Sequence, residues 1–490
     1  MRTPARFGPA AIALLTSTVL VATSGRYGYH RDELYFRAAG LHPAFGYVDQ
    51  PPLTPLLARV GSELFGDSPT GLRVLPALTV GLVVLLAGVI ARELGGGPGA
   101  QALASAATAV SGFPLAIGHM LSTDTLGLLS WTALSWLLIR ALRDGGTRWL
   151  PVGLVAGIGL QNKYLIAALL AALTVGLLIT GPRTVARDRW LWLAVLLAVA
   201  VWAPNLVWQA LHGWPQLRMV GVISGGGTGF STPRWSFLPY QLVLYGLLLT
   251  PIWLAGWWRL ARDPALVRQR CFAVGFVVLF VALIAANGKA YYATGIYPLL
   301  LGAGADPVLR WFSSARSRRI VIGTALTLTT AVNAYLFLPL VPADRLAGSP
   351  IPAVNPTAAE TVGWPEFAAT LSAAYRSLPP DQRASTVVLG NNYGEAGAVD
   401  RFRSEFELPA AFSGQNSYHG WGPPPESATG VLAVRVPEPT LRRWFASVTS
   451  VAHIDNRVGL DNDEQGQVVW LCQGRNAPWT TIWPQLRRVG

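Results

Sequence analysis

Long apolar stretches recur along this 490-residue chain, and short turns, several of them rich in arginine, separate them. About eleven stretches are long enough to cross a ~30 Å hydrocarbon core as helices. Only 13% of the residues are charged, against about 25% in ordinary soluble domains. The sequence therefore predicts an α-helical polytopic membrane protein. The spans are expected near residues 7–24, 70–91, 100–118, 122–141, 148–161, 163–180, 190–211, 237–258, 271–287, 290–309 and 319–340.

The arginines between these stretches fall on one side if the spans alternate. Arg2 and Arg6 precede the first span, and further clusters occupy the turns near residues 140–148, 183–189, 259–270 and 310–319. The positive-inside rule makes that side cytoplasmic. We therefore expect a multi-pass protein of the cell membrane with a cytoplasmic N-terminus. The net charge of +13 then reports topology, and no nucleic-acid partner is expected. Residues 1–24 could alternatively be a cleaved signal peptide, which leaves the side of the next loop unchanged.

Three longer segments are expected on the extracytoplasmic side: residues 25–69, residues 212–236 with Gly225-Gly226-Gly227, and the tail 341–490. Within the tail, apolar runs alternate with helical patterns. The runs are Val387–Gly390, Val431–Val436 and Val468–Cys472, and the helical patterns lie near 393–404 and 438–446. We therefore expect a transmembrane domain over residues 1–340, followed by a small extracytoplasmic α/β domain over 341–490.

The first outer segment, 25–69, carries adjacent carboxylates, Asp32 and Glu33. One of them at a membrane surface could act as general base for a hydroxyl nucleophile, and the other could orient the acceptor or balance charge. Alternatively, both open a short helix over Asp32–Ala39, where acids complement the helix dipole and cap free amides. The two interpretations are compatible, because a helix start also fixes a carboxylate in place.

Two further acids lie on the same expected side. Asp49 precedes Gln50-Pro51-Pro52 and could be a site residue or a turn former. Asp124 opens a span and could cap that helix, or belong to a polar site at the membrane surface. After Asp49, an amphipathic interfacial helix is expected. Its apolar face would carry Leu53, Leu56, Leu57, Val60 and Leu64.

Of the 38 basic residues, only Lys163 and Lys289 are lysine, and both lie in tight turns on the expected outer face. The positive-inside bias disfavours cations at this face. The two lysines are thus exceptions both to this bias and to the use of arginine elsewhere in the chain. A need for a compact ammonium that binds a phosphate as a point charge would account for both lysines. Snorkelling at the interface is the alternative, and Tyr291, Tyr292 and Tyr297 fit an aromatic belt equally well.

Together, these motifs resemble glycosyltransferase family 39, in the bacterial branch related to dolichyl-phosphate-mannose–protein mannosyltransferases and lipid A aminoarabinose transferases. The resemblance covers roughly residues 25–340. It depends on Asp32-Glu33, Gly46…Asp49-Gln50-Pro51-Pro52-Leu53, Asp124, Gly159-Leu160-x-x-Lys163 and Lys289-x-Tyr291-Tyr292 leading into Tyr297-Pro298. In the tail, Asn391–Gly397 and Trp421–Pro424 look like the outer domain of many bacterial members.

The resemblance implies a GT-C fold and an inverting transferase that moves a sugar from a polyprenyl-phosphate donor to an envelope acceptor, either glycan, lipid or protein. Asp32 would then be the base and Glu33 its support. Lys163 and Lys289, with Arg31 and Tyr292, would hold the lipid phosphate. The outer domain differs from that of the protein mannosyltransferases, which puts protein acceptors in doubt.

No cofactor is expected and no metal-ligand cluster is evident, although carboxylates near a phosphate could recruit a divalent ion. The alternative function is a polytopic transporter of a lipid or small solute. Against it, the sequence has no repeated halves, and its polar residues collect at one face rather than at the midplane.

Overall fold

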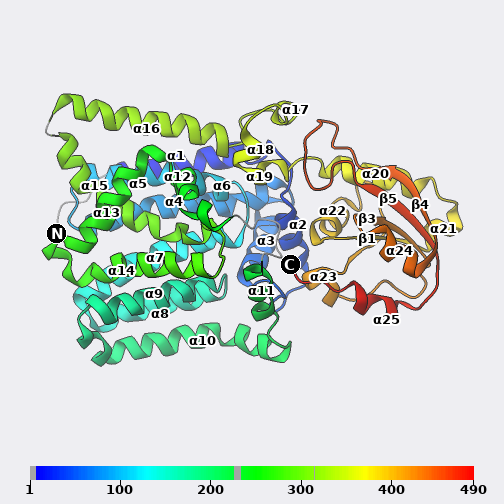
Figure 1. Cartoon of the computed structure of the whole chain (residues 1–490), viewed down its shortest axis with the longest axis horizontal. Coiled ribbons are helices and arrows are strands. Elements are labelled where there is room, and N and C mark those ends of the chain that lie inside the picture. Colours follow the sequence, from blue (N-terminus) through cyan, green and yellow to red (C-terminus); the bar gives the residue numbers. More distant parts are fainter. Residues whose placement is uncertain (1–6, 226–232, 314) are drawn as a thin grey trace.

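The computed structural model describes residues 7–225, 233–313 and 315–490, so that Arg2, Arg6, Gly226 and Gly227 lie outside the described residues. Helices dominate the chain up to residue 337 (Figure 1). They are α1 (Gly8–Thr23), α2 (Arg31–Leu41), α3 (Leu53–Phe65), α4 (Pro69–Glu93), α5 (Pro98–Ala109), α6 (Gly112–Gly118), α7 (Thr123–Asp144), α8 (Trp149–Leu160), α9 (Leu165–Thr180), α10 (Arg189–Leu211), α11 (Pro215–Ser224), α12 (Phe237–Tyr245), α13 (Thr250–Arg262), α14 (Arg270–Ala285), α15 (Tyr297–Ser313) and α16 (Arg316–Phe337). Short 3-10 turns join several of them, including η4 (Leu247–Leu249) and η6 (Ala290–Ile296).

Each of the expected spans coincides with one of these helices or with a bent pair. Among the described residues, five helices are long and apolar enough to cross a membrane alone. Two pairs of helices pass the same test only when each pair is taken together: α5 with α6, which bend by 62°, and the segments containing α12 and α13, which bend by 87°. If each bent pair is one span, the described residues have up to seven spans. Helices α1 and α9 are apolar but shorter. The protein is therefore a multi-pass helical membrane protein, and the number eleven stays a prediction.

The spans form a bundle with a protein-buried centre and a lipid-exposed rim. The apolar windows of α4 and α7 are 61% and 67% buried, whereas those of α10 and α16 are only 11% and 17% buried. Figure 1 shows α10 and α16 at opposite edges of the bundle, with α4 and α7 between them. Apolar side chains such as Leu196 and Ile320 stay more than 60% exposed there, as expected for helices whose solvent is hydrocarbon.

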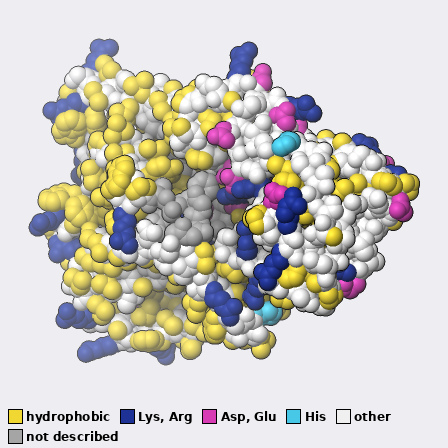
Figure 2. Space-filling view, turned by 45° about the vertical axis from the view of Figure 1, so that its right-hand side comes forward, with side chains coloured by type: hydrophobic (Ala, Val, Ile, Leu, Met, Phe, Trp, Pro, Cys, Tyr) yellow, Lys and Arg dark blue, Asp and Glu magenta, His cyan; other side chains and the backbone are white. Residues whose placement is uncertain are grey.

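Charge is distributed unevenly between the two ends of the molecule. On the face drawn in Figure 2, lysine and arginine rim the left-hand end of the apolar bundle, while the acidic side chains lie toward the other end, with further basic side chains among them. At the basic end, Glu93 forms ion pairs with Arg143 at 2.7 Å and with Arg140 at 3.9 Å. One end thus has the arginine excess that the turns predict.

Beyond residue 337 the chain forms a five-stranded mixed sheet with helices around it. The strands are β1 (Thr386–Gly390), β2 (Ala411–Ser413), β3 (Gly430–Val434), β4 (Phe445–His453) and β5 (Val468–Arg475), in the order β2-β1-β3-β5-β4. Strand β1 is parallel to β2 and β3, while β5 is antiparallel to β3 and β4. The helices are α17 (Ala343–Leu346), α18 (Ile351–Val354), α19 (Pro356–Ala359), α20 (Trp364–Arg376), α21 (Pro380–Ala384), α22 (Tyr393–Phe402), α23 (Asn416–Gly420), α24 (Glu438–Trp444) and α25 (Trp479–Ile482).

The expected small α/β region is confirmed, with two differences. Strands β1, β3 and β5 and helix α22 match the sequence patterns, but α24 stops at Trp444 instead of continuing to residue 446. The residues that follow form β4, which the hydropathy pattern did not indicate. Its exposed positions hold small or β-branched residues such as Thr449 and Val451. The strand therefore forms because of β-propensity and pairing with β5, and not because of a continuous apolar run.

The first outer segment folds against this α/β region rather than lying as a free loop (Figure 1). One hydrophobic cluster contains Tyr29, Leu34 and Tyr35 together with Phe367 and Val399. Helix α3 turns Leu56 and Leu64 outward, 52% and 69% exposed, which fits the interfacial amphipathic helix expected there. Helices α2 and α3 therefore lie between the bundle and the sheet.

Candidate active site

Helix α2 begins at the paired acids. The His30 side chain accepts a hydrogen bond from the Asp32 amide, and the Glu33 carboxylate accepts one from the His30 amide at 2.9 Å. Such a capping box satisfies amides that have no partner within the helix. The expectation of a helix starting at these acids is confirmed, and the cap holds Asp32 in the first turn.

Glu33 is completely buried. Its carboxylate pairs with Arg73 of α4 through contacts of 2.9 and 2.6 Å, and it also accepts the Leu121 amide at 2.8 Å. Arg73 further donates to the carbonyl oxygens of Ser24 and Gly28. The pair therefore ties α2 to α4 and to the segment before α7, and the carboxylate oxygens are occupied by protein groups.

Asp32, in contrast, keeps about a third of its side chain exposed. Its Oδ1 accepts a 2.8 Å hydrogen bond from the Tyr393 hydroxyl of α22. Burial disfavours the ionised carboxylate, but His30, Arg31, the Tyr393 hydroxyl and Lys289 outweigh burial and hold the pKa of Asp32 below its ordinary value. Asp32 is therefore an accessible carboxylate in its ionised form.

Asp49 lies close to Asp32. Its Oδ1 accepts the Tyr35 hydroxyl at 2.7 Å, and the Tyr35 ring stacks on the Tyr393 ring with centroids 4.6 Å apart. Burial, reinforced by the charge of Asp32, raises the pKa of Asp49 to about 6 although the Tyr35 hydroxyl favours the ionised form. Two stacked tyrosines thus hold the two carboxylates, Tyr35 that of Asp49 and Tyr393 that of Asp32.

Lys163 faces the bundle side of the same region. Its Nζ lies 2.7 Å from Asp124 Oδ1 and 4.9 Å from the centre of the Tyr292 ring. The tight turn before α9 closes through the Lys163 amide and the Gly159 carbonyl oxygen at 2.9 Å. The N-cap of α7 is Ser122, not Asp124. Asp124 instead pairs with the ammonium.

A buried asparagine, Asn162, fixes this turn. Its side chain accepts the Thr54 hydroxyl of α3 at 2.7 Å and donates to the Thr123 carbonyl oxygen at 2.6 Å. The Leu53 amide also donates to the Gln161 carbonyl oxygen at 3.0 Å. The start of α3, the turn and the start of α7 are therefore locked together, and this sets the positions of Lys163 and Asp124.

Lys289 lies in the turn between α14 and η6, with its Nζ 5.9 Å from the centre of the Tyr291 ring. The Lys163 ammonium is 5.5 Å from the same ring. Burial and the neighbouring Lys163 charge lower the pKa of Lys289, while Asp32 and Asp124 act in the opposite direction. The two lysines, Asp32 and Asp124 therefore share one electrostatic environment, although four separate segments supply them.

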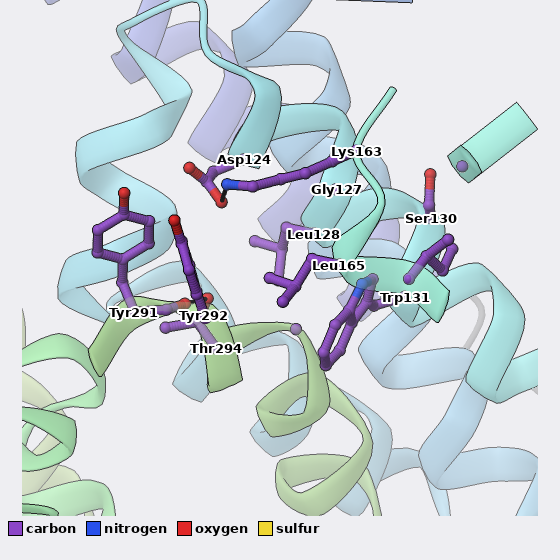
Figure 3. A pocket seen from close by; sticks show the side chains of 13 residues that line it. Asp124, Gly127, Leu128, Ser130, Trp131, Lys163, Leu165, Tyr291, Tyr292 and Thr294 are labelled. Carbon is purple, nitrogen blue, oxygen red and sulfur yellow. Dashed lines mark hydrogen bonds and ion pairs between the residues drawn. The ribbon is translucent and has the colours of Figure 1, made fainter. Parts of the chain in front are cut away.

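A pocket lies beside Lys163 (Figure 3). In Figure 3 the Lys163 side chain reaches Asp124 above the Tyr292 ring, and Trp131 lies across the pocket. The charged groups, Lys163 and Asp124, lie together at one end, while Ser130 lies beside Trp131 and most of the remaining wall is apolar. The lining residues are Asp124, Gly127, Leu128, Ser130, Trp131, Gly159, Lys163, Leu165, Ile166, Tyr291, Tyr292, Thr294 and Gly295.

Arg31 joins α2 to the tail. Its guanidinium lies 2.9 Å from Glu360 and 2.9 Å from Asp463, and it contributes to the charge around Asp32. Arg31 is therefore close to the base candidate but is engaged by carboxylates of the tail. Within the described ranges, no group of three or more His, Cys, Asp or Glu side chains is arranged to hold a metal ion.

The sequence patterns did not single out several residues of this site. Tyr35, Asn162 and Arg73 are neighbours of the predicted residues in space, and Tyr393 comes from the other end of the chain. A signal existed for two of them: Asn162 stands directly before Lys163, and Tyr393 lies within the family-like Asn391–Gly397 segment. Arg73 lies near the start of the span expected at 70–91, at the expected extracytoplasmic end of that span. An arginine at this end is contrary to the positive-inside rule.

Comparison with known proteins shows which proteins this chain is similar to. The family model described as dolichyl-phosphate-mannose-protein mannosyltransferase matches residues 49–208. An undecaprenyl phosphate-alpha-4-amino-4-deoxy-L-arabinose arabinosyl transferase of Pseudomonas savastanoi pv. phaseolicola is 26% identical over 327 residues, covering 62% of this chain and 60% of the relative. A relative with the same description from Pseudomonas fluorescens Pf-5 is 26% identical, covering 67% of this chain and 62% of its own length. The chain thus spans about 60% of these relatives.

Among solved structures, apo ArnT from Cupriavidus metallidurans superposes with a TM-score of 0.61 at 14% identity, covering 94% of this chain and 97% of that one. The same protein bound to undecaprenyl phosphate gives 0.58 with the same coverage. At this identity the similarity concerns the fold. Together, the matches confirm the resemblance to glycosyltransferase family 39, including its aminoarabinose-transferase branch, and the GT-C fold.

Proposed function

We propose that this chain, with its GT-C fold and its resemblance to glycosyltransferase family 39, is an inverting membrane glycosyltransferase. It would move a sugar from a polyprenyl-phosphate donor to an acceptor of the cell envelope. The observation that carries the proposal is the position of the charged pair Lys163 and Asp124 at one end of a largely apolar pocket. A lipid-linked phosphate needs both a cation for its charge and an apolar wall for its chain.

In this proposal Asp32 is the general base. It takes the proton of the acceptor hydroxyl while the hydroxyl oxygen attacks the anomeric carbon from the face opposite the phosphate. The bond between that carbon and the phosphate oxygen breaks, and the lipid phosphate leaves as an anion. The lowered pKa keeps Asp32 ionised at neutral pH, and its partial exposure leaves the carboxylate open to an acceptor hydroxyl.

Lys163 and Lys289, with Tyr292, would hold the departing phosphate. Preorganised cations aimed at the charge that develops on a leaving group lower the barrier, and Asp124 keeps the Lys163 ammonium in place. Leu128, Trp131, Leu165 and Ile166 would contact the first units of the lipid chain. Asp49 and Arg31 would stand on the acceptor side, next to the tail.

Glu33 has a different role in this proposal. Because its carboxylate is enclosed by Arg73 and backbone amides, it would act through the position of α2 and not at the reacting atoms. We further propose that residues 1–340 form the catalytic membrane domain and 341–490 an extracytoplasmic domain that covers the site and contributes to acceptor choice. The N-terminus would then be cytoplasmic.

The test uses membrane vesicles that contain the full chain and envelope acceptors, supplied with radiolabelled undecaprenyl-phosphate sugars. These include the 4-amino-4-deoxy-L-arabinose form named in the relatives. Wild type should transfer label to an acceptor, and Asp32→Asn should lose about a hundredfold or more in rate, within the range of general-base removal. The exposed Asp381→Asn in the tail is the matched control. Undiminished transfer by Asp32→Asn would overturn the base assignment, and lipid-independent solute uptake would favour a transporter.

A further inference from the structure

We propose that Tyr393 is a positioning residue for Asp32, so that the α/β region completes the catalytic centre instead of only covering it. The inference rests on the proposed function. The Tyr393 hydroxyl occupies Asp32 Oδ1 and thereby leaves Oδ2 as the oxygen that receives the acceptor proton.

The hydroxyl is held in place from both sides of the tyrosine. The ring stacks on Tyr35 of α2 at 4.6 Å with planes 29° apart. On the backbone side, the Tyr393 amide donates to Gln415 Oε1 at 3.0 Å, and Asn392 and Glu395 form a capping box around this first residue of α22. The phenol therefore has little freedom, and its hydrogen bond restricts the Asp32 carboxylate in turn.

Helix α22 approaches α2 closely enough because glycines face the contact. A Cβ at Gly394 would lie 2.6 Å from Arg31 Cβ, and a Cβ at Gly397 would lie 3.0 Å from the Leu34 backbone. Both distances are shorter than ordinary van der Waals contact, so any larger side chain would push α22 away from α2. The two glycines are spaced by one turn, which places them on the same face of the helix.

The effect of the Tyr393 hydroxyl can be separated from that of the neighbouring charges. The titratable groups around Asp32 are His30, Arg31, Asp49, Lys163, Lys289, Tyr291 and Tyr393. His30 Nδ1 lies 3.8 Å from Asp32 Oδ2, which is longer than a hydrogen bond, so it does not hold that oxygen in place. The phenol donates to one oxygen only, and it does so without adding charge that would compete for a phosphate. Orientation is therefore the specific contribution of Tyr393.

The first test is Tyr393→Phe in the full chain, assayed in vesicles with labelled undecaprenyl-phosphate sugar. The phenyl ring keeps the stack on Tyr35. We expect kcat at pH 7 to fall about tenfold, in line with the loss of one hydrogen bond to a charged group, with the donor KM changed less than twofold. Because the phenol favours the ionised carboxylate, the acid limb of the rate profile should move up by about one pH unit.

Tyr375→Phe is the matched control, since the Tyr375 hydroxyl donates to the Arg383 carbonyl oxygen within the α/β region. It should leave kcat and the acid limb unchanged. A wild-type kcat and pH profile in Tyr393→Phe would overturn the inference, and so would a raised donor KM at unchanged kcat, which would make Tyr393 a donor-binding residue. If wild type itself transfers no sugar, the proposed function fails and the inference falls with it.

The second test moves α22 without touching the phenol. In folded protein, Gly397→Ala should reproduce the upward shift of the acid limb, because it separates Tyr393 from Asp32. Gly420→Ala in α23 is the control, since a Cβ there meets nothing within 4 Å. A folded Gly397→Ala protein with the wild-type kcat and acid limb would overturn the role given to the α2–α22 contact.

Discussion

Arg73 Nη2 lies 2.6 Å from Glu33 Oε2, and neither side chain is more than 1% exposed. The pair connects the helix that carries Asp32 to the central span α4, through atoms that neither water nor lipid reaches. Buried charges are stable only when paired, and removal of one partner leaves the other desolvated without compensation.

Glu33→Gln should therefore destabilise the protein by about 3–5 kcal/mol, seen as a lower melting temperature of the detergent-solubilised chain. Adding Arg73→Met should restore part of this loss, because the double variant no longer buries a lone charge. The exposed pair of Arg59 and Glu63, 44% and 60% exposed, provides the control: Glu63→Gln should change stability by less than about 1 kcal/mol. Strict additivity of Glu33→Gln and Arg73→Met would contradict the pairing.

Charge at Lys163 should control use of the lipid donor. Lys163→Glu places a carboxylate beside Asp124 and opposite a phosphate, so kcat/KM for the donor should fall by a hundredfold or more, as when a transition-state donor is lost. Lys163→Arg keeps the positive charge but replaces the compact ammonium, so its kcat/KM for the donor should fall less than that of Lys163→Glu. Arg187→Glu, at the basic end of the bundle, should stay near wild type in the same vesicle assay. Equal activities of the Glu and Arg variants would refute the phosphate-binding role.

The stability of the α/β region should depend on the protonation of Glu395. Burial, reinforced by the charge of Glu464, raises the pKa of this carboxyl from 4.5 to about 8. The folded state thus holds the proton more tightly than the unfolded state does. The contribution of Glu395 is full below about pH 4.5 and is lost as the pH rises to about 8.

Thermal melts between pH 4.5 and 8.5 measure this dependence. The melting temperature of Glu395→Gln should rise relative to wild type as the pH increases through that window, whereas the exposed Glu426→Gln should track wild type throughout. Parallel curves for Glu395→Gln and wild type would show that the carboxyl is already ionised in the folded protein at neutral pH.

The proposed topology can be tested by cysteine labelling in intact cells. Ser427→Cys, exposed in the α/β region, should react with a membrane-impermeant maleimide, while Thr184→Cys, exposed between α9 and α10, should react only after permeabilisation. The native Cys271 and Cys472 are buried, so their background should be low. The opposite pattern would invert the orientation.

The residues at the candidate site differ in how far the sequence could predict them. Asp32, Lys163 and Lys289 stand out because a charged or lysine residue at that point breaks a local trend in composition. No sequence pattern distinguishes Glu33 from Asp32, yet in the structure Glu33 is buried against Arg73 while Asp32 stays partly exposed. Tyr393 lies 361 residues from Asp32, and no periodicity connects them. Adjacent positions on a helix start point in different directions, and only packing decides which one is buried.

The sequence by itself determined that the chain is a bundle of membrane-crossing helices with a small α/β region after it, because hydropathy acts locally and the hydrocarbon core demands internally bonded helices. It also determined which end of the bundle is basic. The tertiary structure alone decided that α22 docks on α2 through Gly394 and Gly397 and brings Tyr393 to Asp32. Contacts between distant segments depend on shape complementarity of whole elements, which the order of residues along the chain does not display.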